Sequence, residues 1–326
     1  MRVVVLIPDL RHDLLARART ALQSTRARRF LSARIPLWIR EVRGGTLNLM
    51  RHCAVARSLG VDAVLATARG RDVYGPQLGI GTLPFIRWSQ RQPDDVCIVP
   101  DIYTYLIDAV AAAVVAYEQS PEQVHNDFDH TRANVSIWAD SPLMVDRCRA
   151  AYPGTDVTLV PNVVDPIAFP FLESAYRTPG ELIAFPRKGA AFIDATYRRY
   201  RELGGRYWQL QRVDGLPFYQ LAARFRTPQA FLASADVEGC ALPPQEAMAA
   251  GIVVVGRSAG GANFCMRHNE TALVAETAED AAAALRSIED AAVRMRLSGA
   301  AYEYIQRFFP KNEPTQFWRD LLSRHP

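Results

Sequence analysis

Two glutamates, Glu238 and Glu246, flank the run Gly-Cys-Ala-Leu-Pro-Pro-Gln. The two prolines suit the first turn of a helix, where their missing N–H groups cost little, and Gly251 suits the end of that helix. This pattern places Glu238 in the loop after a predicted strand over 230–232, and Glu246 in the first turns of the helix. Carboxylates at the carboxyl end of such a strand can accept hydrogen bonds from sugar hydroxyls. The alternative is that Glu246 only complements the positive end of the helix dipole.

Two cations, Arg187 and Lys188, follow a predicted strand over 182–185. Fixed cations lower the barrier of a reaction in which negative charge develops beside them. Arginine can bind a phosphate through two parallel hydrogen bonds, whereas lysine acts as a point charge. The pair can therefore bind an anion; the alternative is a surface pair at a strand end.

Two glycine pairs, Gly44-Gly45 and Gly260-Gly261, are the remaining local signals. A glycine turn lets backbone N–H groups approach an oxygen anion, with the dipole of the next helix behind it. Glycines are also common in ordinary turns, so neither pair is decisive alone. Each pair could therefore let backbone N–H groups approach an anionic ligand.

The elements that must position these residues alternate between short β-branched runs and longer helical segments. This alternation favours two α/β domains with parallel sheets covered on both faces. The predicted strands are 3–7, 63–67, 96–99, 114–117, 135–138, 157–160, 182–185, 208–213, 230–232, 252–255 and 272–275, and the clearest helices are 47–59, 143–151, 192–203 and 279–289. Prolines from Pro161 onward force an extended path typical of a linker. Two such domains would place a ligand cleft between the carboxyl ends of their sheets.

The composition is that of a soluble globular protein, with 49% hydrophobic and 22% charged residues and a net charge of +4. The five cysteines are scattered, which is typical of reduced thiols in a cytoplasmic protein, and no clustered ligands indicate zinc. The longest apolar stretch, 109–117, is too short to span a bilayer, which takes about 20 residues. We expect a cytoplasmic protein that is at most peripheral at the inner face of the membrane.

One segment departs from the alternation. Residues 10–34, within an insertion over 10–40, are helical in pattern and rich in arginine, and they carry an apolar stripe that includes Leu14, Leu15 and Leu22. A basic amphipathic helix can lie on anionic lipid, so this segment is a candidate for peripheral membrane contact. The alternative is an insertion packed on the first domain with its arginines in water.

The segment Glu238 to Glu246 resembles the E-x7-E motif of retaining GT-B glycosyltransferases, specifically glycosyltransferase family 4, and the resemblance continues in order over most of the chain. Its other parts are Gly44-Gly45 before the helix 47–59, Pro161-Asn162-Val163-Val164-Asp165, Phe185-Pro186-Arg187-Lys188-Gly189, Ser258-Ala259-Gly260-Gly261-Ala262 and Gln316-Phe317-Trp318. The resemblance implies a GT-B fold, in which two Rossmann-like doubly wound domains face each other across a cleft and a C-terminal helix crosses back to the first domain. We therefore expect an acceptor-side domain over 1–165, a nucleotide-sugar domain over 166–307 and the returning helix over 308–326.

The resemblance also implies a role for each matching residue. Glu246 would hold the ribose hydroxyls of the nucleotide, Glu238 would lie at the donor sugar, and the cations at 187 and 188 would hold the diphosphate. The implied catalytic residues are Glu238, Arg187 and Lys188; the donor-binding residues are Glu246, Gly260, Gly261, Leu242 and Gly239; and the acceptor and phosphate loop holds Gly44, Gly45 and Glu118.

Several positions depart from the family pattern. Val163 replaces the glycine of the linker signature, and Arg187 and Lys188 are adjacent where the family separates its two cations. Phe264 and Cys265 stand where the Gly-Gly turn usually leads to a glutamate. The family's first-domain histidine has no match, and Glu118 occupies roughly its place. These departures keep open an inactive GT-B-like protein that binds a sugar nucleotide or a carbohydrate.

The activity implied by the resemblance is retaining transfer of a sugar, of the hexosyltransferase type, from a nucleotide-diphosphate donor to an acceptor hydroxyl. Such an enzyme would serve cell-surface or natural-product glycan biosynthesis, with a glycan, a lipid-linked sugar or a small molecule as acceptor and no nucleic-acid partner. No cofactor and no metal are expected. Asp127-Phe128-Asp129 could hold manganese, as in the GT-A fold, but it follows a polar stretch and is typical of a solvated loop.

Overall fold

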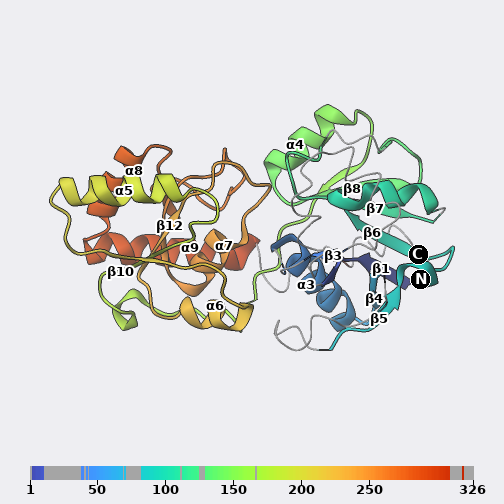
Figure 1. Cartoon of the computed structure of the whole chain (residues 1–326), viewed down its shortest axis with the longest axis horizontal. Coiled ribbons are helices and arrows are strands. Elements are labelled where there is room, and N and C mark those ends of the chain that lie inside the picture. The colour runs from blue at the N-terminus through green and yellow to red at the C-terminus, as the bar shows by residue number, and fades with distance from the viewer. Residues whose placement is uncertain are drawn as a thin grey trace. The chain divides into compact units, whose positions relative to one another are not determined.

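The computed structural model describes residues 2–10, 38–39, 42, 44–68, 70, 82–110, 112–124, 129–165, 167–308 and 318. The chain divides into two compact units. Unit 1 comprises Met1–Asp140, Met144–Val160 and Pro314–Pro326, and unit 2 comprises Ser141–Leu143 and Pro161–Glu313. Each unit is an α/β structure with its own parallel sheet (Figure 1). The chain passes between the units at Val160–Pro161, where the prolines favour an extended path.

Unit 1 is built on a seven-stranded sheet in which every strand pair is parallel. Its strands are β1 (Arg2–Leu6), β4 (Asp62–Thr67), β5 (Phe85–Arg87), β6 (Val96–Pro100), β7 (Val114–Glu118), β8 (Val135–Ala139) and β9 (Val157–Leu159). The order across the sheet is β5-β4-β1-β6-β7-β8-β9, so the direction of winding reverses between β1 and β6. A separate parallel pair joins β2 (Asp9–Leu10) to β3 (Trp38–Ile39). All carboxyl ends of the large sheet therefore meet at one edge.

Helices cover the sheet of unit 1. They are α3 (Gly44–Ser58), α4 (Pro142–Ala151) and the 3-10 helices η2 (Trp88–Gln90) and η3 (Asp101–Ala109). One core cluster joins alternate residues of β1, β4, β6 and β7 to Tyr103 and Ile107 of η3. Another joins Ile137 of β8 to Met144 and Cys148 of α4. The alternation follows from the two-residue period of a strand, which sends successive side chains to opposite faces.

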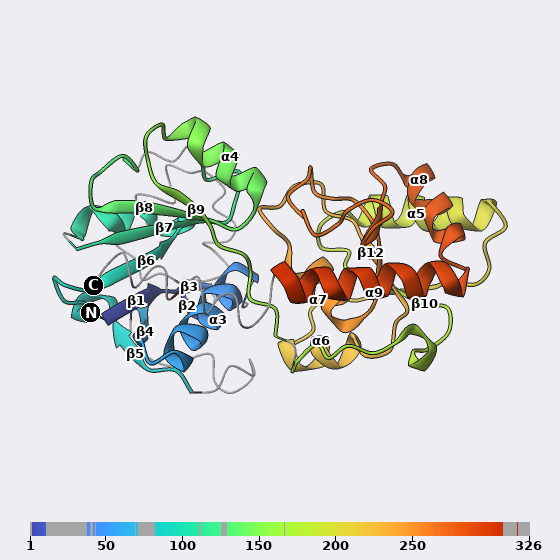
Figure 2. The same ribbon diagram turned by 180° about the vertical axis from the view of Figure 1, so that it is seen from behind.

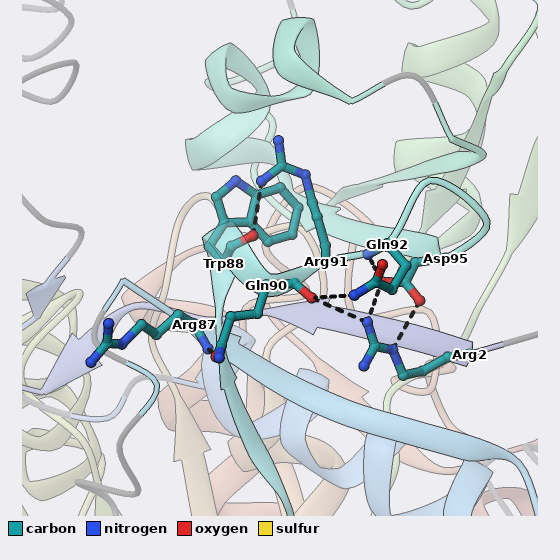
Figure 3. A network of polar contacts seen from close by, with 7 residues as sticks. All are labelled: Arg2, Arg87, Trp88, Gln90, Arg91, Gln92 and Asp95. Carbon is teal, nitrogen blue, oxygen red and sulfur yellow. Dashed lines mark hydrogen bonds and ion pairs between the residues drawn. The ribbon is translucent and has the colours of Figure 1, made fainter.

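A polar network secures the amino-terminal edge of this sheet (Figure 3). Arg2 at the start of β1 donates two hydrogen bonds to the buried carboxylate of Asp95, from Nε at 2.9 Å and from Nη2 at 2.7 Å. The same carboxylate accepts a hydrogen bond from the backbone N–H of Gln92. Beside it, Cζ of Arg91 lies 4.6 Å from the ring centroid of Trp88. The Asp95 carboxylate raises the pKa of Arg2. Because ligands bind at the opposite, carboxyl edge of such sheets, we interpret this network as structural.

Trp318, near the C-terminus, belongs to the core of unit 1. Its side chain is fully buried, and its ring centroid lies 5.4 Å from that of Trp138 in an edge-on arrangement and 6.4 Å from that of His52. Edge-on aromatic pairs are stabilised beyond the area that they bury. The rest of the predicted final helix over 308–326 lies outside the described residues, apart from Phe308.

Unit 2 is built on a five-stranded parallel sheet of order β11-β10-β12-β13-β14. Its strands are β10 (Glu181–Ala184), β11 (Gln209–Arg212), β12 (Ala230–Ala233), β13 (Val253–Gly256) and β14 (Ala272–Val274). Its helices are η4 (Ser174–Tyr176), α5 (Ala190–Glu202), α6 (Phe218–Arg224), α7 (Leu242–Ala250), α8 (Ala278–Ser287) and α9 (Ala291–Phe308). The order reverses between β10 and β12, which is the point where such sheets bind ligands.

Two helix layers sandwich this sheet (Figures 1 and 2). Leu182 and Leu232 face α5 and α8, whereas Ile183, Phe231 and Val254 face α6, α7 and α9. Burying each of these side chains contributes about 1.5–3 kcal/mol relative to leaving it exposed. Both faces of the sheet are therefore apolar at its centre, which explains why β12 and β13 form continuous hydrophobic runs in the sequence.

The predicted strands and the four predicted helices are confirmed, with ends displaced by at most a few residues. The prediction missed β2, β3, β5, α6, α9 and the 3-10 helices η2, η3 and η4. In α9 the side chain of Asp290 accepts the N–H of Ala292 and so caps the helix, a signal that the sequence contained. The basic segment 10–34 lies outside the described residues, except for Leu10. Among the described helices, none is long and apolar enough to cross a membrane.

Candidate functional site

Three loops at the carboxyl edge of the unit 2 sheet hold most of the predicted donor-site residues. The loop after β10 holds Arg187 and Lys188, the loop after β12 holds Glu238 and Gly239, and the loop after β13 holds the Gly260-Gly261 turn. Because β10, β12 and β13 are consecutive neighbours in the sheet, these loops are adjacent. The first two loops flank the point where the strand order reverses.

The turn that carries Lys188 is fixed by Gly189 and Ser234. Gly189 has φ +106, and a Cβ at this position would lie only 2.2 Å from the backbone oxygen of Ser234. The Ser234 hydroxyl donates to the backbone oxygen of Lys188 at 2.8 Å. A larger residue than glycine would force the turn away from β12. The close packing therefore sets the position of the lysine backbone.

The side chains of Lys188 and Glu238 form an ion pair. The lysine Nζ lies 2.8 Å from Glu238 Oε1, and the two side chains are 44% and 22% exposed. The structure thus brings together a cation and a carboxylate that are 50 positions apart in the sequence. Arg187 is exposed on the same turn, and within the described ranges it forms no ion pair.

The loop between Glu238 and α7 is held by three side chains. The Ser141 hydroxyl donates to the backbone oxygen of Gly239 at 2.7 Å, and the Asn162 amide donates to the backbone oxygen of Cys240 at 2.9 Å. The Ala241 N–H donates to the side-chain oxygen of Asn263 at 2.9 Å. Sequence reasoning placed Asn162 in a linker signature but did not predict that it holds this loop.

The helix α7 has the predicted ends. Prolines occupy its first turn, and Gly251 ends it with φ 84, a conformation that favours glycine. Glu246 lies in its middle with a side chain that is only 3% exposed, and Leu242 at its first position is 6% exposed. A carboxylate this deeply buried is costly unless it is bonded, so Glu246 is an unusual residue for a helix that faces the core.

The Gly260-Gly261 turn has the backbone conformation that glycine permits. The φ angles of Ala259, Gly260 and Gly261 are 54, 67 and 90. The Gly261 N–H donates to the Ser258 hydroxyl at 3.1 Å, and that hydroxyl donates to Glu276 at 2.8 Å. Both glycines are exposed. The turn can therefore present backbone to an approaching ligand without a side chain in the way.

The amino ends of α5 and α7 are suited to anions. Neither helix has a side-chain cap at its N-cap residue, Gly189 or Ala241, and neither has an acidic residue in its first turn. In contrast, α8 is capped by the Thr277 hydroxyl and carries Glu279 and Asp280 in its first turn. An uncapped helix start presents N–H groups and a partial positive charge. In α5 this charge lies beside Arg187 and Lys188.

In unit 1, Gly44 and Gly45 are the first two residues of α3. A Cβ on Gly45 would lie 2.9 Å from the side-chain oxygen of Gln119, the residue after β7. The structure therefore brings the glycine pair to the carboxyl end of the strand that carries Glu118. Glu118 itself is fully buried, and its Oε1 lies 3.0 Å from His130 Nε2. In this structure its carboxylate faces His130 and has no exposed surface.

Sequence reasoning named Glu118 but missed three other acids that share this edge. Four neighbouring strands, β1, β6, β7 and β8, each end in a buried acid or precede one by at most three residues: Asp9, Asp101, Glu118 and Asp140. The signal was an acidic residue at the end of each buried strand or within three residues after it. Asp101 accepts the N–H groups of Ile102 at 2.7 Å and Gln119 at 3.1 Å. Burial and then the nearby carboxylate of Glu118 raise the pKa of Asp101 to about 8.

This raised pKa predicts a pH dependence of stability. The usual pKa of aspartate is about 4. At a pH between about 4 and about 8, Asp101 therefore binds a proton in the folded protein but not in the unfolded chain. Its contribution to the free energy of unfolding is therefore complete below pH 4 and falls as the pH rises toward 8. Urea unfolding should be measured for the wild type and for Asp101→Asn from pH 5 to pH 8. As the pH rises, the variant should gain stability relative to the wild type.

Glu118→Gln is the control. Removing the neighbouring carboxylate should lower the pKa of Asp101 and so narrow the pH range over which its contribution to stability falls. A difference between Asp101→Asn and wild type that stays constant with pH would contradict the prediction.

The candidate manganese site falls partly outside the described residues, which include neither Asp127 nor Phe128. Asp129 is exposed. Its carboxylate accepts two hydrogen bonds from Thr131, from the backbone N–H at 2.9 Å and from the side-chain hydroxyl at 2.6 Å. These bonds lower the pKa of Asp129. Among the described residues, no group of three His, Cys, Asp or Glu side chains could hold a metal ion. All five cysteines are free and buried.

Residues 215–304 match the family model described as Glycosyl transferases group 1. This segment includes Glu238, Glu246, Gly260 and Gly261. It covers a minority of the chain. No curated protein matches the chain.

Solved structures extend the likeness to the whole chain. Sucrose-phosphate synthase from Thermosynechococcus elongatus is 14% identical, with a TM-score of 0.66 over 99% of this chain and 100% of that chain. HepE from Anabaena, solved with UDP and glucose, is 12% identical, with a TM-score of 0.63 over 99% and 100%. A variant of TarM from S. aureus, solved with fondaparinux, α-GlcNAc-glycerol and UDP, is 11% identical, with a TM-score of 0.59 over 72% of this chain and 57% of that chain.

Identities this low establish the fold and not the activity. The two parallel-sheet α/β units, in the strand orders described above, have the GT-B fold of these relatives. The segment that matches Glycosyl transferases group 1, 215–304, lies within unit 2.

Proposed function

We propose that this protein is a retaining glycosyltransferase of family 4, which transfers a hexose from a nucleotide-diphosphate donor to an acceptor hydroxyl without a metal ion. One observation carries the proposal: the loops after β10, β12 and β13 bring two cations, a carboxylate and a glycine turn to one edge of the unit 2 sheet. A diphosphate needs the cations and the uncapped start of α5, and a sugar needs acceptors for its hydroxyls.

The chemistry follows from these charges. As the bond between the sugar and the diphosphate breaks, negative charge grows on the leaving phosphate oxygen. Lys188 and Arg187 compensate that charge and so lower the barrier without a metal. Glu246 accepts hydrogen bonds from the ribose hydroxyls, and Glu238 does so from the sugar. Gly239, Leu242, Gly260 and Gly261 line the donor side.

The acceptor is proposed to bind on the side of Gly44, Gly45 and Glu118. A glycan, a lipid-linked sugar or a small molecule would offer the hydroxyl. The basic segment 10–34, which lies outside the described residues, would bring the protein to an anionic membrane surface on the cytoplasmic side. Flotation with liposomes that contain or lack anionic lipid tests this contact, and equal flotation with both would exclude an electrostatic attachment.

A ligand panel tests the donor site. The melting temperature should rise with at least one of the diphosphates of uridine, guanosine, adenosine and thymidine, because a ligand at 100 times its Kd stabilises the fold by about 2.7 kcal/mol. Glu246→Ala should lower the affinity for that nucleotide by about tenfold to a hundredfold, since hydrogen bonds to a charged group contribute about 1.5–3 kcal/mol. Glu270→Ala, which removes an exposed carboxylate of unit 2, is the control.

No shift with any of the four nucleotides would overturn the donor site. Binding without turnover of any sugar nucleotide would instead identify an inactive binding protein. Turnover that disappears with a chelator and returns with manganese would overturn the metal-independent mechanism.

A further inference from the structure

The cation proposed to hold the diphosphate and the carboxylate proposed to lie at the sugar are bonded to each other, since Lys188 Nζ lies 2.8 Å from Glu238 Oε1. We infer that this ion pair is exchanged on donor binding: the diphosphate replaces Glu238 as the partner of Lys188, and the released carboxylate accepts hydrogen bonds from the sugar. The inference rests on the proposed function and adds to it a device that separates the intact donor from its nucleotide product.

The residue type at position 188 favours such an exchange. Of the 38 basic residues in the chain, only Lys188 and Lys311 are lysines. Arginine would hold a carboxylate through two parallel hydrogen bonds, whereas the lysine ammonium is a compact charge on a flexible stem whose donors rotate. A lysine can therefore move from one anion to another without losing a bidentate contact.

The backbone on both sides of the pair is fixed, so the exchange requires only side-chain rotation. Gly189 is packed against Ser234, whose hydroxyl bonds the lysine carbonyl, and the two residues after Glu238 are held by Ser141 and Asn162. The side chains themselves are partly exposed. Rotamers of exposed side chains interconvert in picoseconds to nanoseconds, so the exchange does not limit donor binding.

The ion pair affects the intact donor and the nucleotide product differently. Every diphosphate must displace Glu238 from Lys188, which weakens the binding of all of them. A donor that carries its sugar gives Glu238 new hydrogen bonds in return, whereas a nucleoside diphosphate gives none. The pair should therefore lower the affinity for the product more than the affinity for the donor.

The test uses Glu238→Gln, which removes the charge but keeps the size of the side chain. Its affinity for inorganic pyrophosphate should be about twofold to fivefold higher than that of the wild type, the range expected when a partly exposed ion pair no longer competes. The matched control is Asp236→Asn, which removes a carboxylate from the same loop whose partner is Arg257. Its affinity should equal that of the wild type.

A second measurement follows the lysine itself. With lysine labelled by carbon-13 at Cε, the protein has two lysine signals, and Lys188→Arg identifies one of them as Lys188. In the wild type this signal should shift on addition of pyrophosphate. In Glu238→Gln it should already differ before addition, while in Asp236→Asn it should not.

Two results would overturn the inference, and they are distinguishable. If the wild-type Lys188 signal responds to pyrophosphate but Glu238→Gln binds it no more tightly, the exchange is wrong and the diphosphate site stands. If the Lys188 signal responds neither to pyrophosphate nor to any of the four nucleoside diphosphates, the proposed donor site fails and the exchange fails with it.

The comparison of donor and product completes the test. Isothermal titration should show that Glu238→Gln gains affinity for the nucleoside diphosphate by more than it gains affinity for the matching sugar nucleotide. An equal gain for both would mean that Glu238 does not reach the sugar, and would overturn the second half of the exchange.

Discussion

Replacing Lys188 with alanine should lower kcat for sugar transfer by about 10²–10³-fold, the effect of removing one fixed group that stabilises charge in the transition state. The lysine lies on a turn at the start of α5, where the uncapped helix end adds to its positive potential. Negative charge on the leaving diphosphate is larger in the transition state than in the bound donor. The loss should therefore fall on kcat more than on KM.

The control for this prediction is Arg201→Ala, which removes an exposed cation from the last turn of the same helix. It changes the net charge equally but lies at the far end of α5, so its kcat should stay close to the wild-type value. The kcat of both variants is measured from the initial rates of sugar release from the donor and of transfer to the acceptor. If Lys188→Ala and Arg201→Ala have the same kcat, Lys188 does not act at the leaving group.

The double variant Lys188→Ala with Glu238→Gln separates two contributions to that loss. In Lys188→Ala alone, the carboxylate of Glu238 stays at the site without its cation and repels the diphosphate. If this repulsion contributes, the double variant should bind the nucleotide more tightly than Lys188→Ala. Residues in direct contact are expected to show such non-additive effects.

Much of the fold follows from the sequence because parallel strands buried on both faces form continuous apolar runs. This explains why β4, β7 and β13 are predicted to within a residue or so. The ends of α7 are predictable for a local reason as well, since its prolines and Gly251 act on their own backbone. In contrast, β5 is a short edge strand of three residues, and η3 is a 3-10 helix without the 3.6-residue period.

The arrangement of the site is not predictable in the same way, because it depends on strand order. The sequence places Lys188 after one strand and Glu238 after another, with β11 between them along the chain. Only the order β11-β10-β12 makes the two loops neighbours. The bonds from Ser141 and Asn162 to the loop after Glu238 also join residues far apart in the sequence, by 98 and 78 positions. No local pattern encodes such contacts.

Arg177 lies outside the proposed site, and its replacement should strongly reduce the stability of unit 2. Its side chain is 3% exposed, and its guanidinium donates to four backbone oxygens, those of Leu172, Phe225, Pro228 and Ala250. Three of the bonds are 2.9–3.1 Å long. Burial lowers its pKa to about 10, so the group remains charged at neutral pH. This one side chain joins the linker, the end of α6, the approach to β12 and the end of α7.

Arg177→Met should therefore lower the free energy of unfolding of unit 2 by about 3–5 kcal/mol, because methionine fills the space but leaves buried carbonyl oxygens without donors. Arg177→Lys should fall between methionine and wild type, since an ammonium has three donors and no planar fork. Urea unfolding measures the change, and hydrogen exchange assigns the transition to peptides of unit 2.

The control is Arg206→Met, which replaces an exposed arginine of unit 2 and should change stability by no more than about 0.5 kcal/mol. The position of the lost bonds also predicts an effect on the site. The Arg177 guanidinium bonds the carbonyl of the last residue of α7, where a cation favours the helix dipole, and α7 carries Glu246. Nucleotide binding should therefore weaken together with the stability of unit 2. An Arg177→Met protein of wild-type stability would show that water replaces the guanidinium at these carbonyls, and the structural role assigned to Arg177 would be wrong.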